Sequence, residues 1–208
     1  MQVYEMIANE RRALADVVDE LTPEQLRTQS LCGAWTVRDV IAHLVMPLDS
    51  GKPALALVLI SARGDFHRAN RVLTGRHATR PVTELAGSLR RGAEHRFRPP
   101  GMGPEAPLTD LLVHGQDIRR PLGLGREFGA ERISLALRFL TETKARRFVP
   151  AGRLDGLRFE ATDLDWSYGR GPAVRGPAEA LLLAVTGRPA ALDDLDGDGV
   201  AALRTRVA

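Results

Sequence analysis

Two stretches of the sequence place histidine and acidic side chains where they could bind a metal ion. The first, WTVRDVIAHL, covers residues 35–44 and contains His43. The second, LTDLLVHGQDIRR, covers residues 108–120 and contains Asp110, His114 and Asp117. Ionised carboxylates and histidines are seldom buried without partners, and a divalent metal suits an Asp-x3-His pair that faces another histidine. The two stretches together therefore predict a metal site.

Two interpretations of the histidines stay open at this point. A single histidine on the flank of a helix is more often a core residue with one hydrogen bond, and for His43 alone that interpretation is favoured. Two histidines and an acid at ligand spacing on two separate helices also fit a shared ion.

Both stretches have the periodicity of helices. Thr36 is the expected N-cap of the first helix, and Asp39 would close a capping box three residues later. His43 then lies beside the apolar stripe, which consists of Val37, Val40, Ile41, Leu44 and Val45. At about 100° per residue, Asp110, His114 and Asp117 share one side of the second helix with Leu111 and Ile118.

LCGA followed by WTVRDVIAHL, together with LLVHGQDIRRPLG, resembles the actinobacterial mycothiol-dependent maleylpyruvate isomerase family, over nearly the whole chain. The resemblance implies that His43, Asp110 and His114 bind a divalent metal, usually taken as zinc. The best-known members have Glu where this chain has Asp110. Asp is one methylene shorter, so either the helix lies closer to the ion, a water intervenes, or Asp117 takes the place.

The resemblance also implies the domain organisation. We expect an α+β protein that is mainly α, with a DinB-like four-helix bundle at residues 1–148 as the metal-binding domain. A small sterol-carrier-like α+β domain would follow at residues 149–208. Short strands at 157–161, 165–168 and 173–175 and a buried helix at 178–185 are typical of such a domain, which again ends with Gly187 and Arg188.

The periodicity predicts the other elements of the bundle. Helices are expected at residues 3–21 and from Pro23 through Leu26, and the His43 helix should end near Met46 and Pro47. A helix from about residue 54 to 73, one from 82 to just before Pro99, and one at 131–147 should follow. The breaker-rich residues 99–107 form either a pocket rim or a plain connector.

Three protein ligands leave coordination positions open for a water or a thiol, and a divalent ion lowers the pKa of either. The resemblance supplies mycothiol as the cosubstrate, for isomerisation or thiol transfer on a small electrophile. Asp117 would orient a ligand or act as the alternate one, and Arg188 would bind an anionic group, with Asn70 and Arg71 as weaker candidates. No catalytic residue is assigned. The alternative is a non-catalytic DinB-like protein that binds a metal or ligand.

The remaining composition restricts partners and location. The net charge of +3 comes from basic residues scattered among acids, which does not indicate a nucleic-acid-binding surface. No apolar run suggests a signal peptide or membrane span, so we expect a cytoplasmic protein that binds no membrane. Cys32 is the only cysteine, and a small buried filler is favoured over a nucleophile there. The sequence gives no oligomeric state.

Overall fold

A computed structural model of the chain describes residues 2–33, 35–49, 66–125, 127–142, 145 and 148–207. The chain divides into two compact units, Met1–Arg126 and Glu127–Ala208. The division falls earlier than residue 148, because the helix α8, Ala130–Glu142, packs against α9 of the second unit. The predicted domain boundaries, 1–148 and 149–208, stay a prediction.

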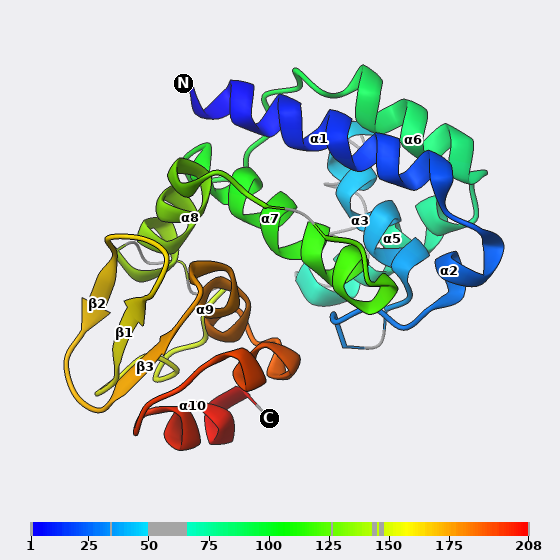
Figure 1. The fold of residues 1–208 in the computed structure, drawn as a ribbon. Helices are drawn as coiled ribbons and strands as arrows, with labels where there is room; N and C mark the ends of the chain where they lie inside the picture. Colours follow the sequence, from blue (N-terminus) through cyan, green and yellow to red (C-terminus); the bar gives the residue numbers. More distant parts are fainter. Residues whose placement is uncertain are drawn as a thin grey trace. The chain divides into compact units, whose positions relative to one another are not determined.

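The first unit is a helical bundle (Figure 1). Its described helices are α1 (Val3–Glu20), α2 (Pro23–Arg27), α3 (Val37–Asp49), α5 (Phe66–Ala78), α6 (Val82–Arg91) and α7 (Glu105–Arg119), and the 3-10 turn Arg120–Leu122 follows α7. Helix α1 packs against α6 and α7, and α3 packs against the same two helices. These four therefore form the expected four-helix bundle, and α5 packs against α3.

The bundle core consists of apolar side chains from the helices of this unit. Its largest fully buried side chains are Met6, Ile7, Leu14, Ile41, Leu85, Leu89, Leu108, Leu112 and Ile118. Each large aliphatic side chain buried in this way contributes about 1.5–3 kcal/mol to folding relative to exposure. The packing of α3 and α7 in this core fixes the two helices that carry the predicted ligands.

Two helix ends differ from the prediction. Helix α3 continues through Pro47 to Asp49, although Pro47 has no N–H to donate to the carbonyl of His43 four residues earlier. Asp49 accepts hydrogen bonds from Arg80 and Ser88, which hold this last turn. Helix α6 ends at Arg91, well before Pro99, because buried Arg11 donates to the carbonyls of Gly92, Ala93 and His95.

The helix predicted at 54–73 lies partly outside the described residues. Its described part belongs to α5, which runs beyond Leu73 to Ala78. The end predicted at residue 147 also lies outside them, since the described part of α8 ends at Glu142.

The second unit has the predicted β-β-β-α order. Strands β1 (Arg158–Ala161), β2 (Ser167–Gly169) and β3 (Ala173–Gly176) form a sheet in the order β2-β1-β3, antiparallel between β1 and β2 and parallel between β1 and β3. Helix α9 (Ala178–Val185) is buried along most of its length and packs on β1 and β3. The 3-10 segment Pro189–Asp194 and helix α10, Val200–Val207, complete the unit. The fold class, α+β and mainly α, is confirmed.

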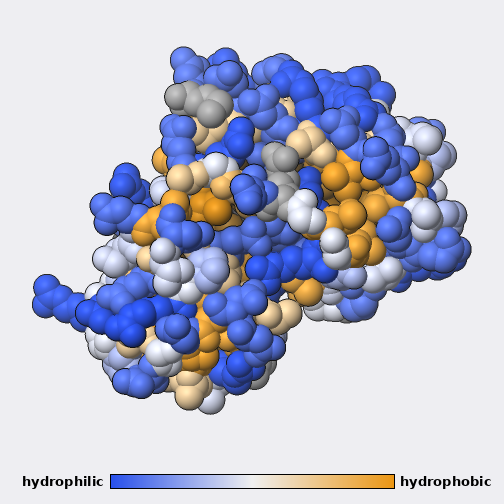
Figure 2. Space-filling model, in the orientation of Figure 1, coloured by the Kyte–Doolittle hydropathy of each residue, from blue (hydrophilic) through white to orange (hydrophobic). Residues whose placement is uncertain are grey.

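Hydrophilic residues cover most of the face shown in Figure 2. Within the described part of the chain, no helix is both long enough and apolar enough to cross a lipid bilayer.

Candidate metal centre

Helix α3 fixes the position of His43 through its start. The backbone N–H of Thr36 donates to Oδ2 of Asp39 at 2.9 Å, and the N–H of Asp39 donates to Oγ1 of Thr36 at 3.3 Å. This is the predicted capping box, and it ties the first turn to the β-bridge between Thr36 and Gln29. The side chain of His43 follows on the flank of the buried stripe and is 15% exposed.

Helix α7 carries the other predicted ligands into the protein. From Ala106 to Arg119, every residue of this helix except Asp110 is buried. Asp110 is 31% exposed, His114 is 10% exposed and the side chain of Asp117 is fully buried. The carboxylate of Asp110 therefore lies at the boundary between the core and solvent.

Asp110 lies between the two histidines. Its Oδ2 is 3.6 Å from Nε2 of His43, and its Oδ1 is 3.5 Å from Nε2 of His114. These distances are long for hydrogen bonds. Two ligand atoms that each lie about 2.1 Å from one tetrahedral ion are about 3.4 Å apart, which is close to the separations found here. The donor atoms of His43, Asp110 and His114 all lie within 4.8 Å of one another.

The outer nitrogen of each imidazole has its own acceptor. Nδ1 of His43 lies 3.1 Å from Oδ1 of Asn70, and Nδ1 of His114 lies 2.7 Å from Oδ2 of Asp117. Because the oxygen of an amide or a carboxylate accepts hydrogen bonds, Nδ1 is the donor in both contacts. Each ring then presents its Nε2 to Asp110. Two imidazole nitrogens and a carboxylate that converge in this way fit a divalent cation.

The structure adds Trp35 and Cys32 to this site. The centroid of the Trp35 ring lies 5.0 Å from that of His43 and 6.2 Å from that of His114, so the indole is a wall of the site. Its position directly before the helix cap is the only signal for this residue in the sequence. Cys32 is only half-buried and was expected to be buried.

Cys32 belongs to a second possible donor set, with His114 and Asp117. This set shares His114 with the first. Because Asp117 already accepts the Nδ1 proton of His114 at 2.7 Å, the arrangement favours the set of His43, Asp110 and His114.

The predicted anion-binding residues lie in different places. Asn70 contacts His43, and Arg71 is exposed on α5. Arg188 lies in the second unit directly after α9, where its guanidinium donates to the carbonyl of Thr186 at 2.7 Å. Its role toward an anion stays a prediction.

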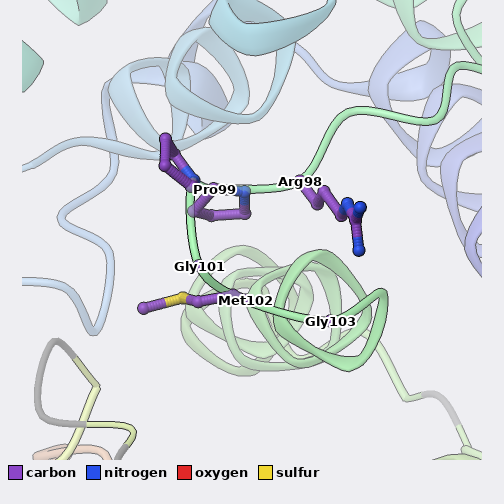
Figure 3. A pocket seen from close by; sticks show the side chains of 6 residues that line it. Arg98, Pro99, Gly101, Met102 and Gly103 are labelled. Carbon is purple, nitrogen blue, oxygen red and sulfur yellow. The ribbon is translucent and has the colours of Figure 1, made fainter.

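A cavity of about 410 Å³ opens on the breaker-rich loop that precedes α7 (Figure 3). The lining residues are Arg98, Pro99, Pro100, Gly101, Met102 and Gly103. None of the three ligand candidates is among them. Because only residues of the loop itself line this cavity, the role of residues 99–107 at the rim of the metal site stays a prediction.

Comparison with known proteins places the chain in a family. The family model described as the mycothiol maleylpyruvate isomerase N-terminal domain matches residues 7–119, more than half of the chain. The crystal structure of a mycothiol-dependent maleylpyruvate isomerase is similar, with 16% identity, a TM-score of 0.51 and 95% of each chain covered. A histidine-to-alanine mutant of that enzyme matches with 15% identity, a TM-score of 0.52 and the same coverage.

At these identities the two structures show that the fold is shared over both units. No curated protein matches the sequence. The family match covers α3 and α7, which carry the ligand candidates. The chain therefore belongs to the mycothiol maleylpyruvate isomerase family of enzymes.

Proposed function

We propose that the protein is a metal-dependent, mycothiol-using isomerase or thiol transferase that acts on a small electrophile with an anionic group. The observation that carries this proposal is the convergence of Nε2 of His43, Nε2 of His114 and the Asp110 carboxylate, at N–O distances of 3.6 and 3.5 Å. Membership of the mycothiol maleylpyruvate isomerase family suggests that such a centre would be used for thiol chemistry.

His43, Asp110 and His114 would hold the divalent ion, which we propose to be zinc because imidazole and carboxylate ligands suit it. Bound there, it would lower the pKa of a thiol in an open coordination position, so that a thiolate exists at neutral pH. Asp110 reaches both histidines with its two oxygens, so the shorter acid can bind without Asp117 replacing it. Asp117 would keep His114 in the tautomer that a ligand needs.

The remaining side chains would bind the reactants. Trp35, beside both imidazoles, would shield the reacting sulfur from water. Arg188, and more weakly Arg71, are our candidates for binding an anionic group. In an isomerase, the cosubstrate thiolate forms a C–S bond to a cis double bond conjugated to a carbonyl, and the electron pair moves to the carbonyl oxygen. After rotation, that pair returns, the C–S bond breaks and the thiolate leaves.

Low-molecular-weight thiols are kept reduced in the cytoplasm, so we place the enzyme there. Its partners would be small molecules, and neither a nucleic acid nor a membrane is part of the proposal.

Elemental analysis of the purified protein, paired with a mycothiol assay on a panel of electrophiles that includes maleylpyruvate, tests the proposal. We expect one divalent ion per chain in the wild type and its loss in His43→Ala and in His114→Ala. His95→Ala is the matched control, since His95 is exposed and lies outside the donor set. Unchanged metal content in both site variants would contradict the ligand assignment.

The same assay distinguishes an isomerase from a thiol transferase. An isomerase regenerates mycothiol at each turnover, whereas a transferase consumes one thiol for each product. Metal binding without turnover of any electrophile in the panel would instead support the non-catalytic DinB-like binding protein.

A further inference from the structure

The two predicted histidine ligands have different partners at their outer nitrogens. His114 has a fully buried carboxylate, Asp117, at 2.7 Å on its own helix. His43 has a neutral amide, Asn70, at 3.1 Å on a different helix. The His43–Asn70 contact joins α3 to α5, two helices that pack against each other in the first unit.

The amide oxygen of Asn70 can only accept a hydrogen bond, which determines the state of His43. With the proton on Nδ1, the Nε2 lone pair of His43 is directed at Oδ2 of Asp110, 3.6 Å away. With the proton on Nε2, the ring would present an N–H to the same carboxylate and could not bind a cation. The position of one proton therefore decides whether His43 is a ligand.

We propose that Asn70 is a positioning residue that keeps His43 in the Nδ1–H tautomer, and that its neutral amide makes His43 the more weakly binding of the two histidines. This inference rests on the proposed metal site. A carboxylate at Nδ1 increases the electron density on the ligating nitrogen more than an amide does, and partners of this kind change metal affinity by about 10–100-fold.

Asn70 then acts behind the ligands, in place of the anion-binding role that the sequence suggested. Its carboxamide oxygen is directed at the imidazole, and the side chain is only half-buried. The substitution Asn70→Leu keeps the size and removes the acceptor. The substitution Asn70→Asp keeps the acceptor and gives His43 the same kind of partner as His114.

Metal affinity, measured by zinc competition with a chelator, provides the first test. We expect Asn70→Leu to bind zinc about 10-fold more weakly or worse than the wild type, and Asn70→Asp to bind it at least as tightly. Val72→Ala is the matched control on α5, because Val72 is 42% exposed. Equal affinity in Asn70→Leu and the wild type would overturn the inference.

The second test uses the metal-free protein and does not depend on activity. Two-bond proton–nitrogen correlations of the imidazole show which ring nitrogen carries the proton, and the spectrum of His43→Ala identifies the signals of His43. We expect Nδ1–H in the wild type and in Asn70→Asp, and a mixture of tautomers in Asn70→Leu. An Nε2–H signal in the wild type would overturn the inference.

The two proposals fail in different ways. If neither the wild type nor any variant binds zinc, the proposed metal function fails, whichever tautomer the spectra show. If the wild type binds zinc and loses it in His114→Ala, but Asn70→Leu binds normally, only the role of Asn70 fails.

Discussion

Oδ2 of Asp117 lies 2.7 Å from Nδ1 of His114, and the carboxyl group that makes this contact is fully buried. The two residues are three positions apart on α7, so one helical turn brings them together. The sequence left open whether Asp117 is a ligand or a support for a ligand. The contact with Asp117 occupies Nδ1 of His114 and leaves Nε2 for the ion. It therefore favours Asp117 as a support for the ligand His114.

The substitution Asp117→Asn removes the charge behind His114 and keeps the size of the side chain. We expect zinc affinity to fall by about 10–100-fold, because the imidazole becomes a poorer donor. Chelator competition measures the change, and Asp193→Asn is the control, since Asp193 pairs with Arg204 on the surface of the second unit. An affinity equal to that of the wild type would assign Asp117 a role in folding alone.

The proposed role of Asp110 as a ligand can be tested by changing the charge or the length of its side chain. Asp110→Asn removes the only charge among the three ligands, and we expect it to lose the metal at micromolar concentrations. We expect Asp110→Glu to retain metal within about one order of magnitude, because the exposed side of Asp110 leaves room for one methylene. Elemental analysis after dialysis compares the two variants. Metal retained by Asp110→Asn would show that a different acid binds the ion.

Trp35 should report on occupancy of the site. Its ring centroid lies 5.0 Å from that of His43, so an open-shell ion such as Co²⁺ in the site should quench its fluorescence. Zinc, with a filled d shell, should quench it far less. The chain has two tryptophans, and Trp35→Phe should leave an emission that Co²⁺ does not change. Quenching that persists in this variant would place the ion elsewhere.

Arg11 should be important for the stability of the bundle. It is 3% exposed, and burial lowers its pKa to about 10 although nearby Asp110 and Glu94 act in the opposite direction. Arg11→Met leaves the carbonyls of Gly92, Ala93 and His95 without this donor, and we expect a loss of about 2–4 kcal/mol in urea denaturation.

Arg12 provides the matched control for that substitution. It is the next residue on α1, and its ion pair with Glu94 is exposed. Arg12→Met should therefore cost about 0.5 kcal/mol or less. Equal losses in the two variants would mean that the buried hydrogen bonds of Arg11 contribute nothing specific.

Asp49 should make stability depend on acidic pH. Burial acts to raise its pKa, but the hydrogen bond from Ser88 and the ion pair with Arg80 outweigh burial and hold the pKa below 3.8. The folded pKa is below the unfolded one, so the stabilisation is present above pH 3.8 and is lost as the pH falls through the folded pKa.

We expect Asp49→Asn to lower the free energy of unfolding at pH 7 by about 1 kcal/mol, with a smaller difference from the wild type near pH 3. Urea denaturation at both values measures this. A difference that does not change with pH would show that the charge of Asp49 is not what stabilises the end of α3.

Local patterns predicted much of the fold. The Thr36–Asp39 capping box, the apolar stripe of α3 and the order of β1, β2, β3 and α9 are all present as expected. The ends of α3 and α6 were missed, because they depend on Asp49 with Ser88 and on Arg11 with Gly92, pairs that are 39 and 81 residues apart. A short stretch of sequence does not contain both members of such a pair, so local patterns cannot predict these contacts.

The sequence by itself determined which residues could be ligands, because helical spacing places Asp110, His114 and Asp117 on one side of α7 and His43 beside the stripe of α3. Only the tertiary structure decided that His43 reaches Asp110, and that Asn70 and Trp35 lie against the same imidazole. The spacing within a helix is set by its own backbone geometry. The distance between side chains on α3, α5 and α7 is set by the packing of the whole core, to which residues throughout the bundle contribute.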